Sequence, residues 1–176
     1  RGIRFVQVPT TFLAAVDSSV GGKTAIDLKA GKNMAGALYQ PHLVLCDVDM
    51  LDTLPEEVFA DGIAETLKYG VIGDAELFEK TAKSDFRNDL EEIIETCVKM
   101  KRDIVMEDEF DTGVRQLLNL GHTLGHAIES YYNYETYSHG SAVAVGMCMM
   151  AEKTCTPDVA ETLKNCVRAY DLPTEV

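Results

Sequence analysis

The pattern of hydrophobic and polar positions changes its period near residue 55. Before that point, short apolar runs are bounded by glycine and proline, which is typical of strands and turns. Strands are expected over residues 4–8 and 42–47, and a β-hairpin over residues 25–39 with its turn at Gly31-Lys32-Asn33. After residue 55, apolar residues recur at every third or fourth position, which indicates helices. The sequence therefore predicts a mainly α protein, in which a multi-helical domain follows a short α/β segment that contains the hairpin.

Local signals place the ends of the predicted helices. Pro55, followed by Glu56 and Glu57, predicts a helix start, because proline suits the first helical position and acids suit the positive end of the helix dipole. Asp74 is a candidate N-cap for a short helix that ends near residue 82. Further helices are expected over residues 90–106, 115–129 and 138–150, and from residue 157 to a point before Pro173.

Residues 115–129 have an unusual arrangement of polar positions if they form one helix. Five polar residues would then fall within an arc of roughly 80°: Arg115, Asn119, His122, His126 and Glu129. Leucine and isoleucine occupy the opposite side, and small residues flank the polar stripe where a solvated face would carry Lys and Glu. The stripe is therefore expected to form the wall of a pocket. The alternative is an amphipathic surface helix with exposed histidines.

Metal-type ligands fall on three separate segments, which contribute Glu65, then His122 or His126, and then His139. Two imidazoles and one carboxylate form a zinc-binding set that leaves a coordination position for substrate. His139 is expected in the first turn of its helix, where the dipole favours a neutral imidazole. Spacing alone does not decide between the two histidines of the 115–129 segment, which could also bind one metal together.

Lys101 interrupts the apolar face of the helix predicted over residues 90–106. Its alkyl chain either carries the ammonium group to the surface or delivers the charge into a binding site. The sequence pattern leaves both interpretations open.

The chain is acidic, with 29 Asp and Glu against 16 Lys and Arg in 176 residues and a formal net charge of −13. This balance disfavours nucleic acid or an anionic membrane as a partner, because either would favour a run of basic residues. Five cysteines without a C-x-x-C pair favour a reduced, cytoplasmic protein. The longest apolar stretch, residues 142–151, is too short to span a bilayer. Gly21-Gly22-Lys23-Thr24 is similar to the end of a nucleotide-binding P-loop, but Asp17 stands where that motif requires glycine.

Four long motifs follow one another along the chain as they do in the 3-dehydroquinate synthase family of sugar phosphate cyclases. They are VPTTFLAAVDSSVGGKTAIDLKAGKNMAGALYQP, GIAETLKYGVI, RQLLNLGHTLGHAIE and HGSAVAVGM. The resemblance implies a zinc- and NAD-dependent lyase of the shikimate pathway of aromatic amino acid biosynthesis, cytoplasmic and homodimeric. Its reaction converts 3-deoxy-D-arabino-heptulosonate 7-phosphate into 3-dehydroquinate and phosphate, and NAD is regenerated in each turnover.

The resemblance also implies roles for single residues. Zinc falls to Glu65, His122 and His139, while His126 becomes a proton-transfer residue at the substrate phosphate. Lys23, Lys101, Arg115 and, weakly, Asp111 join it as catalytic residues. The implied substrate contacts are Arg1, reaching in from a neighbouring subunit, and Asp17, Lys23, Asn33, Lys68, Lys101, Arg115, Asn119 and His126. The implied NAD contacts are Thr10, Thr11, Lys32, Met50, Leu51, Asp52 and Thr53.

Departures from the family pattern limit these expectations. Asp111 and Ser141 each stand where the family usually carries Glu. We expect a fragment, because the family's glycine-rich NAD-binding turn would precede Arg1 and another phosphate-binding lysine would follow Val176. On this view residues 1–54 end an NAD-binding domain, and residues 55–176 form the zinc- and substrate-binding domain of a dehydroquinate synthase-like fold. The alternatives are another sugar phosphate cyclase, a metal-dependent alcohol dehydrogenase, or a helical domain that is inactive alone.

Overall fold

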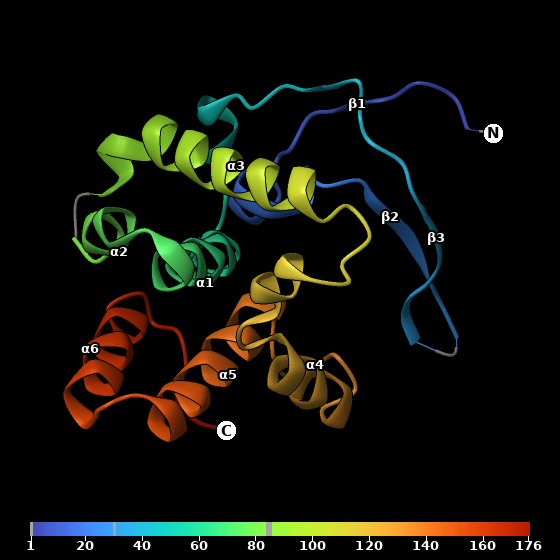
Figure 1. Cartoon of the computed structure of the whole chain (residues 1–176). Helices are drawn as coiled ribbons and strands as arrows, with labels where there is room; N and C mark the ends of the chain where they lie inside the picture. Colours follow the sequence, from blue (N-terminus) through green and yellow to red (C-terminus); the bar gives the residue numbers. More distant parts are fainter. Residues whose placement is uncertain (1, 30, 84–85) are drawn as a thin grey trace.

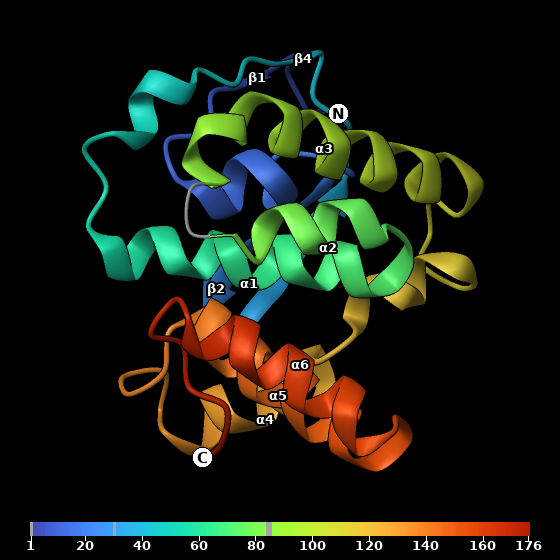
Figure 2. The ribbon, with the colours of Figure 1, turned by 90° about the vertical axis from the view of Figure 1, so that its left-hand side faces the viewer.

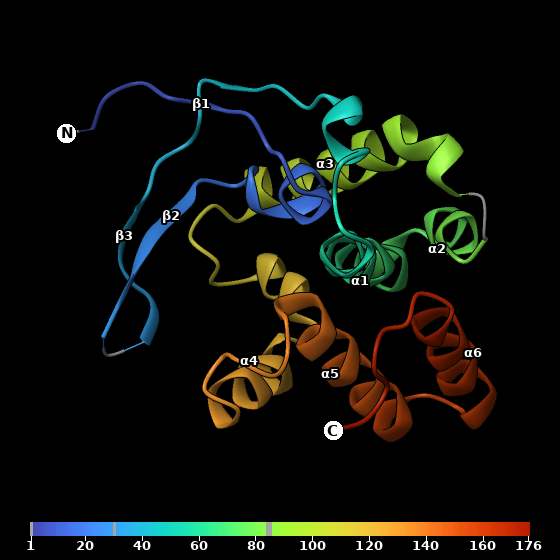
Figure 3. The ribbon, with the colours of Figure 1, turned by 180° about the vertical axis from the view of Figure 1, so that it is seen from behind.

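Helices dominate the chain after residue 55, as the sequence pattern predicts. The computed structural model describes residues 2–29, 31–83 and 86–176. The α-helices are α1 Glu56–Gly73, α2 Ala75–Thr81, α3 Leu90–Glu107, α4 His122–Tyr131, α5 His139–Thr154 and α6 Pro157–Arg168. Helix α1 runs through the middle of the molecule, with α3 on one side and α5 on the other (Figure 1). Helices α4 and α6 flank α5 on the side away from α3 (Figures 2 and 3).

Side chains at the helix starts explain several of these boundaries. Pro55 is the N-cap of α1, one residue earlier than the first helical position predicted for it. Asp74 caps α2 as predicted, because its carboxylate accepts a hydrogen bond of 2.9 Å from the backbone N–H of Leu77. Ser138 caps α5 in the same way through the backbone N–H of Ser141, at 3.3 Å.

The core is centred on α1, which packs against α3, α5 and a short π-helix, η1 Ala14–Ser18, and η1 also packs against α3. The rings of Phe12 and Phe59 stack there with centroids 4.6 Å apart, and both side chains are buried. Burying each such side chain contributes roughly 1.5–3 kcal/mol, so this cluster fixes η1 against α1. The segment between the first strand and the hairpin, for which the sequence analysis gives no element, is therefore a helical turn packed into the core.

The short strands lie at the edge of the helical body. Strand β1 Val6–Gln7 pairs in parallel with β4 Leu43–Val44. Strands β2 Lys23–Leu28 and β3 Gly31–Leu38 form the predicted antiparallel hairpin, which stands away from the helices in Figure 1. The predicted turn is wrong, because Gly31-Lys32-Asn33 lies within β3.

The single helix predicted over residues 115–129 is also wrong. Residues Val114–Asn119 form a 3-10 helix, η4, and α4 begins only at His122. Gly121 separates them with a φ of 78°, in the left-handed region that favours glycine. A β-carbon on Gly146 of α5 would collide with the carbonyl oxygen of Gly121. Two glycines thus allow this break to pack directly against α5.

No α-helix in the described ranges combines the length and hydrophobicity that a membrane span requires.

Candidate active site

A cavity of about 690 Å³ opens between the β2–β3 hairpin and the helices. Its wall is built from η1, α1, α3, η4, α4 and α5, so residues distant in sequence meet there. Ten of the residues singled out from the sequence line it: Asp17, Lys23, Asn33, Lys68, Lys101, Arg115, Asn119, His122, His126 and His139. Four of the five residues of the polar stripe therefore line a cavity as predicted, although two separate helices carry them, and Glu129 does not line it.

Two imidazoles that line this cavity, those of His122 and His139, meet a buried carboxylate. Glu65 of α1 is fully buried, and its Oε1 lies 3.3 Å from Nε2 of His122 and 3.5 Å from Nε2 of His139. Neither carboxylate oxygen of Glu65 has a hydrogen-bond partner of good geometry, although Lys68 forms an ion pair with Oε2. One ligand atom from each of Glu65, His122 and His139 lies within 4.8 Å of the others. A buried carboxylate with an unsatisfied oxygen between two imidazoles suits a zinc-type cation.

His126 stands one turn after His122 on α4 and is exposed. Its ring centroid lies 5.6 Å from that of His122 and 6.0 Å from that of His139. A second group of potential ligands, His126, Glu129 and His139, also lies within 4.8 Å. Distances alone therefore leave His126 within reach of both a metal and a substrate.

The pKa of His139 is raised above its usual value. Burial opposes protonation of this imidazole, but the carboxylates of Glu65 and Glu129 outweigh burial. In the protein alone, these two carboxylates therefore oppose the effect expected of the helix dipole on His139.

Lys101 delivers its charge into the cavity. The side chain is buried, and Nζ donates a hydrogen bond of 2.7 Å to the carbonyl oxygen of Asp17 and lies 3.1 Å from its Oδ1. Lys68 approaches the same carboxylate at 3.8 Å, and the hydroxyl of Tyr69 donates to it at 2.5 Å. Burial raises the pKa of Asp17, but Lys101 and Lys68 outweigh it, so the pKa is lowered. The pKa of Lys101 is lowered, mainly by burial. The carboxylate of Asp17 thus pairs with two buried lysines, Lys68 and Lys101.

Arg115 of η4 holds the turn that precedes β2 and the loop that follows α3. Its guanidinium donates hydrogen bonds to the carbonyl oxygens of Gly21, at 2.8 Å, and Glu109, at 2.7 Å, and the residue is 2% exposed. A guanidinium has five N–H donors, so donors remain for a ligand in the cavity.

Asp111 lies beside the cavity and pairs with a lysine that lines it. Its Oδ2 is 2.5 Å from Nζ of Lys23, whose side chain is 55% exposed. Asp111 adopts a φ of 60°, which is uncommon for a residue with a side chain. The pairing brings Asp111 to the predicted substrate region but does not by itself give it a catalytic role.

Among the residues predicted to bind NAD, those with described side chains do not line this cavity. Thr11 accepts a hydrogen bond of 3.2 Å from the backbone N–H of Ala14, so it caps the turn that leads into η1. Leu51 is 2% exposed and belongs to the core, whereas Thr10, Met50, Asp52 and Thr53 are exposed. Arg1 and the side chain of Lys32 lie outside the described part of the chain.

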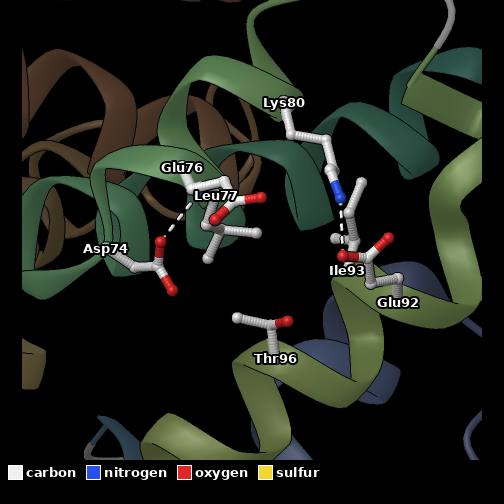
Figure 4. A pocket seen from close by; sticks show the side chains of 7 residues that line it. All are labelled: Asp74, Glu76, Leu77, Lys80, Glu92, Ile93 and Thr96. Atoms are coloured by element: carbon white, nitrogen blue, oxygen red, sulfur yellow. Dashed lines mark hydrogen bonds and ion pairs between the residues drawn. The ribbon is translucent and has the colours of Figure 1, made fainter.

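A smaller pocket between α2 and α3 does not contain any of the predicted site residues (Figure 4). Its volume is about 80 Å³, and an ion pair of 2.6 Å between Lys80 and Glu92 bridges its rim. The pair is accessible to solvent, so this pocket is a surface feature between two helices.

Three supporting residues were not given a role in the site from the sequence, although Glu129 was placed in the polar stripe. Tyr69 holds Asp17, Glu129 faces His139, and Asp61 accepts hydrogen bonds from the hydroxyl of Ser138 and the backbone N–H of Gly140, at 2.5 and 3.0 Å. Asp61 and Tyr69 lie one turn either side of Glu65 on α1. That helical spacing was the available signal for both.

The fold is that of the sugar phosphate cyclases. The chain is similar to a solved 2-deoxy-scyllo-inosose synthase, described as complexed with carbaglucose-6-phosphate, NAD+ and Co2+, with a TM-score of 0.87 and 29% identity over 100% of this chain and 51% of that one. A 2-epi-5-epi-valiolone synthase from Streptomyces hygroscopicus subsp. jinggangensis 5008, described with NAD+ and Zn2+ bound, shares the fold at a TM-score of 0.88 and 24% identity, covering 98% and 51% of the two chains.

Sequence comparison gives the particular family. The model described as 3-dehydroquinate synthase C-terminal matches residues 62–176, and the N-terminal model of the same family matches residues 1–61. A 3-dehydroquinate synthase of Clostridium perfringens strain SM101 is 53% identical over 100% of this chain and 53% of its own length. One from Colwellia psychrerythraea is 46% identical over 98% of this chain and 52% of its length. The chain belongs to the 3-dehydroquinate synthase family and spans about half the length of these curated relatives.

Proposed function

We propose that the whole protein converts 3-deoxy-D-arabino-heptulosonate 7-phosphate into 3-dehydroquinate and phosphate. The observation that carries this proposal is the composition of the cavity. A set of zinc-type ligands and the cations Lys23, Lys68, Lys101 and Arg115 surround one space in a chain with a formal net charge of −13. Concentrated cations in an acidic protein suit a small substrate that carries both phosphate and carboxylate.

Glu65, His122 and His139 hold the metal in this proposal. Solved relatives in the same fold are described with Co2+ and with Zn2+, and the carboxylate and imidazole donors of this chain suit either cation. When bound, such a cation polarises the sugar oxygens that coordinate it. Lys68, paired with Glu65 and close to Asp17, keeps both carboxylates ionised and ready to accept from a ligand or a sugar hydroxyl.

The remaining polar side chains divide between the two anionic ends of the substrate. Lys101 and Arg115 bind the carboxylate from the deep side of the cavity, because both are buried and fixed by backbone carbonyl oxygens. Lys23, Asn33, Asn119 and His126 bind the phosphate from the open side, where they are exposed. Arg1 of a neighbouring subunit completes this set.

His126 transfers the proton at the phosphate end, since it lines the cavity and has no place in the Glu65, His122 and His139 group. Asp111 assists through Lys23 and not by direct contact, because its carboxylate already accepts from Nζ of that lysine. Its shorter side chain, compared with the Glu usual in the family, fits this indirect role.

NAD binding involves the half of the relatives that this chain does not match. NAD supplies a reversible hydride acceptor at the sugar, and the proposed contacts from this chain are Thr10, Thr11, Lys32 and residues 50–53. Residues 1–54 then belong with the NAD-binding domain, and residues 55–176 form the metal- and substrate-binding domain. The whole protein is a cytoplasmic homodimer in this proposal. Light scattering measures its oligomeric state directly.

The main alternative is that the protein is a different sugar phosphate cyclase, because the 2-deoxy-scyllo-inosose synthase shares this fold at 29% identity. The curated 3-dehydroquinate synthases are closer, at 46% and 53% identity. A metal-dependent alcohol dehydrogenase would carry out net hydride transfer, and the 176-residue chain alone could be inactive under any of these assignments.

The whole protein should require NAD yet show no net formation of NADH over many turnovers, because oxidation and reduction occur in one cycle. The measurement follows absorbance at the NADH band together with released phosphate, in the presence of the heptulosonate phosphate. NADH in proportion to phosphate would rule out the cyclase and favour the dehydrogenase. Phosphate release from a sugar phosphate that lacks the carboxylate, and none from the heptulosonate phosphate, would favour another cyclase.

A further inference from the structure

The two imidazoles of the proposed metal site present the same ring nitrogen, Nε2, to the same carboxylate oxygen. His122 and His139 both direct Nε2 toward Oε1 of Glu65. An imidazole that offers the Nε2 lone pair to a cation must carry its proton on Nδ1, and this proton needs an acceptor. The geometry on the Nδ1 side of each ring therefore bears on metal binding.

The acceptor for His122 is a backbone carbonyl. Its Nδ1 lies 3.2 Å from the carbonyl oxygen of Leu120. Leu120 ends η4 in an extended conformation, and Gly121 turns the chain into α4 with a positive φ. The break that the sequence pattern failed to predict therefore orients this imidazole.

His139 faces a carboxylate at the corresponding position. Oε2 of Glu129 lies 3.6 Å from Nδ1 of His139, slightly beyond hydrogen-bond distance, and Glu129 is 2% exposed. Glu129 lies near the end of α4, whereas His139 is the first residue of α5. A small rotation of the imidazole would close this contact. Burying a carboxylate is costly, so its position beside a ring nitrogen indicates a role there.

We propose that Glu129 is a positioning residue that accepts the Nδ1 proton of His139 and so directs its Nε2 to the metal. The inference rests on the proposed metal site at Glu65, His122 and His139. It gives α4 two tasks, because the helix supplies one ligand and orients another ligand that belongs to α5. A carboxylate behind a ligating histidine also increases the basicity of the ring, which strengthens its bond to the metal.

The competing interpretation makes Glu129 a metal ligand itself, together with His126 and His139. That arrangement would use Nδ1 of His139, because Nδ1 is the nitrogen that faces Glu129. It would then compete with Nδ1 protonation and would either move the ion away from Glu65 or add a second ion. Zinc stoichiometry detects a second ion, and the presence or absence of a proton on Nδ1 of His139 in the zinc-loaded chain distinguishes a single ion that has moved.

The test measures zinc affinity of the 176-residue chain by competition with a chromophoric chelator. The variants are Glu129→Leu, Glu129→Gln, His122→Ala and the control Glu135→Gln, which changes an exposed carboxylate beyond the end of α4. We expect one zinc per chain for the unchanged protein and roughly 10–100-fold weaker binding for Glu129→Leu, the usual effect of removing such a partner. Glu129→Gln keeps an oxygen acceptor, so its zinc affinity should lie between that of the unchanged chain and that of Glu129→Leu. Glu135→Gln should bind zinc as tightly as the unchanged chain does.

Nitrogen-15 NMR of the zinc-loaded chain reports the tautomer directly. The Nδ1 proton of His139 should give a resolved, slowly exchanging resonance that Glu129→Leu loses, and circular dichroism checks that the variant remains folded. Unchanged zinc affinity and an unchanged Nδ1 resonance in Glu129→Leu would overturn the positioning role. Loss of a second zinc equivalent would also overturn it, in favour of a ligand role. If neither the unchanged chain nor His122→Ala binds zinc, the proposed metal site itself fails, which is a different result from failure of Glu129 alone.

Discussion

Single residues in the cavity carry charges that would be expensive to bury alone. Glu65 is 0%, Lys68 1% and Lys101 7% exposed, and each faces an opposite charge. Buried ion pairs add little to stability, because desolvation of both ions offsets most of their attraction. The burial of these three charged side chains is therefore better explained by ligand binding than by folding.

Lys101→Met tests this explanation. Asp17 keeps Lys68 and the hydroxyl of Tyr69 as partners, so the free energy of unfolding should fall by less than the ~3–5 kcal/mol typical of an orphaned buried charge. Methionine fits the apolar face, whereas the affinity of the whole protein for the heptulosonate phosphate should fall at least tenfold, since roughly 1.5–3 kcal/mol is typical of a charged hydrogen bond.

Denaturant unfolding and substrate titration measure the two effects of Lys101→Met separately. Lys99→Met is the matched control, because Lys99 lies on the same helix with a side chain that is 54% exposed. A large loss of stability with substrate affinity unchanged would show that Lys101 is structural.

At the scale of helices, the site depends on how closely α4 and α5 approach. His122 begins α4 and His139 begins α5, so their separation follows the packing of the two helices. Gly121 and Gly146 make the approach possible, since a β-carbon on Gly146 would meet the carbonyl oxygen of Gly121. Asp61 then ties the start of α5 to α1, the helix that carries Glu65.

Gly146→Ala should therefore weaken the site from a distance. The added methyl group forces the helices apart, and overpacking of this kind costs typically about 1–3 kcal/mol of stability. Zinc affinity should fall with it, because His122 and His139 would move relative to each other and to Glu65. The checks are thermal unfolding and chelator competition.

Gly73→Ala provides the control for Gly146→Ala. Gly73 ends α1, and a β-carbon there would meet only Met100 Cε at 3.6 Å, an ordinary contact. Equal stability and equal zinc affinity in the two variants would contradict the proposed role of helix spacing.

Helix positions could be predicted from the sequence better than helix breaks. The period of apolar residues and the caps Asp74 and Ser138 are local signals, and the structure follows them. The break at Gly121 is not local, because its positive φ is stabilised by packing against α5. The role of Glu129 likewise depends on tertiary packing, because Glu129 approaches His139 only when α4 and α5 lie side by side.

At the scale of the whole molecule, the sequence predicted most of the helices and strands. It did not show where segments distant along the chain come together. The cavity is lined by segments from Asp17 to His139, and only the tertiary fold brings them together. Family resemblance identified most of these residues, whereas spacing alone left His122 and His126 undecided. Sequence also gave no signal for the parallel pairing of β1 with β4, because the strands are far apart along the chain.

Most of the charges of the cavity differ in sign from the net charge of the chain. The chain as a whole is acidic, whereas Lys23, Lys68, Lys101 and Arg115 gather around one cavity, which suits the anionic substrate of the proposed function. His122 and His139 line the same cavity, and both lie close to the buried Glu65. The central claim is therefore that Glu65, His122 and His139 bind one metal ion and that His126 serves the substrate.

Zinc content of His122→Ala and His126→Ala after identical dialysis tests that claim most directly. The unchanged chain should retain about one zinc, and His126→Ala should retain the same amount, because it keeps all three ligands. His122→Ala should lose its zinc, since Glu65 and His139 alone bind too weakly. In the whole protein, His126→Ala should instead lose roughly two to four orders of magnitude in turnover. Equal loss of zinc from both variants, or none bound by the unchanged chain, would contradict the account.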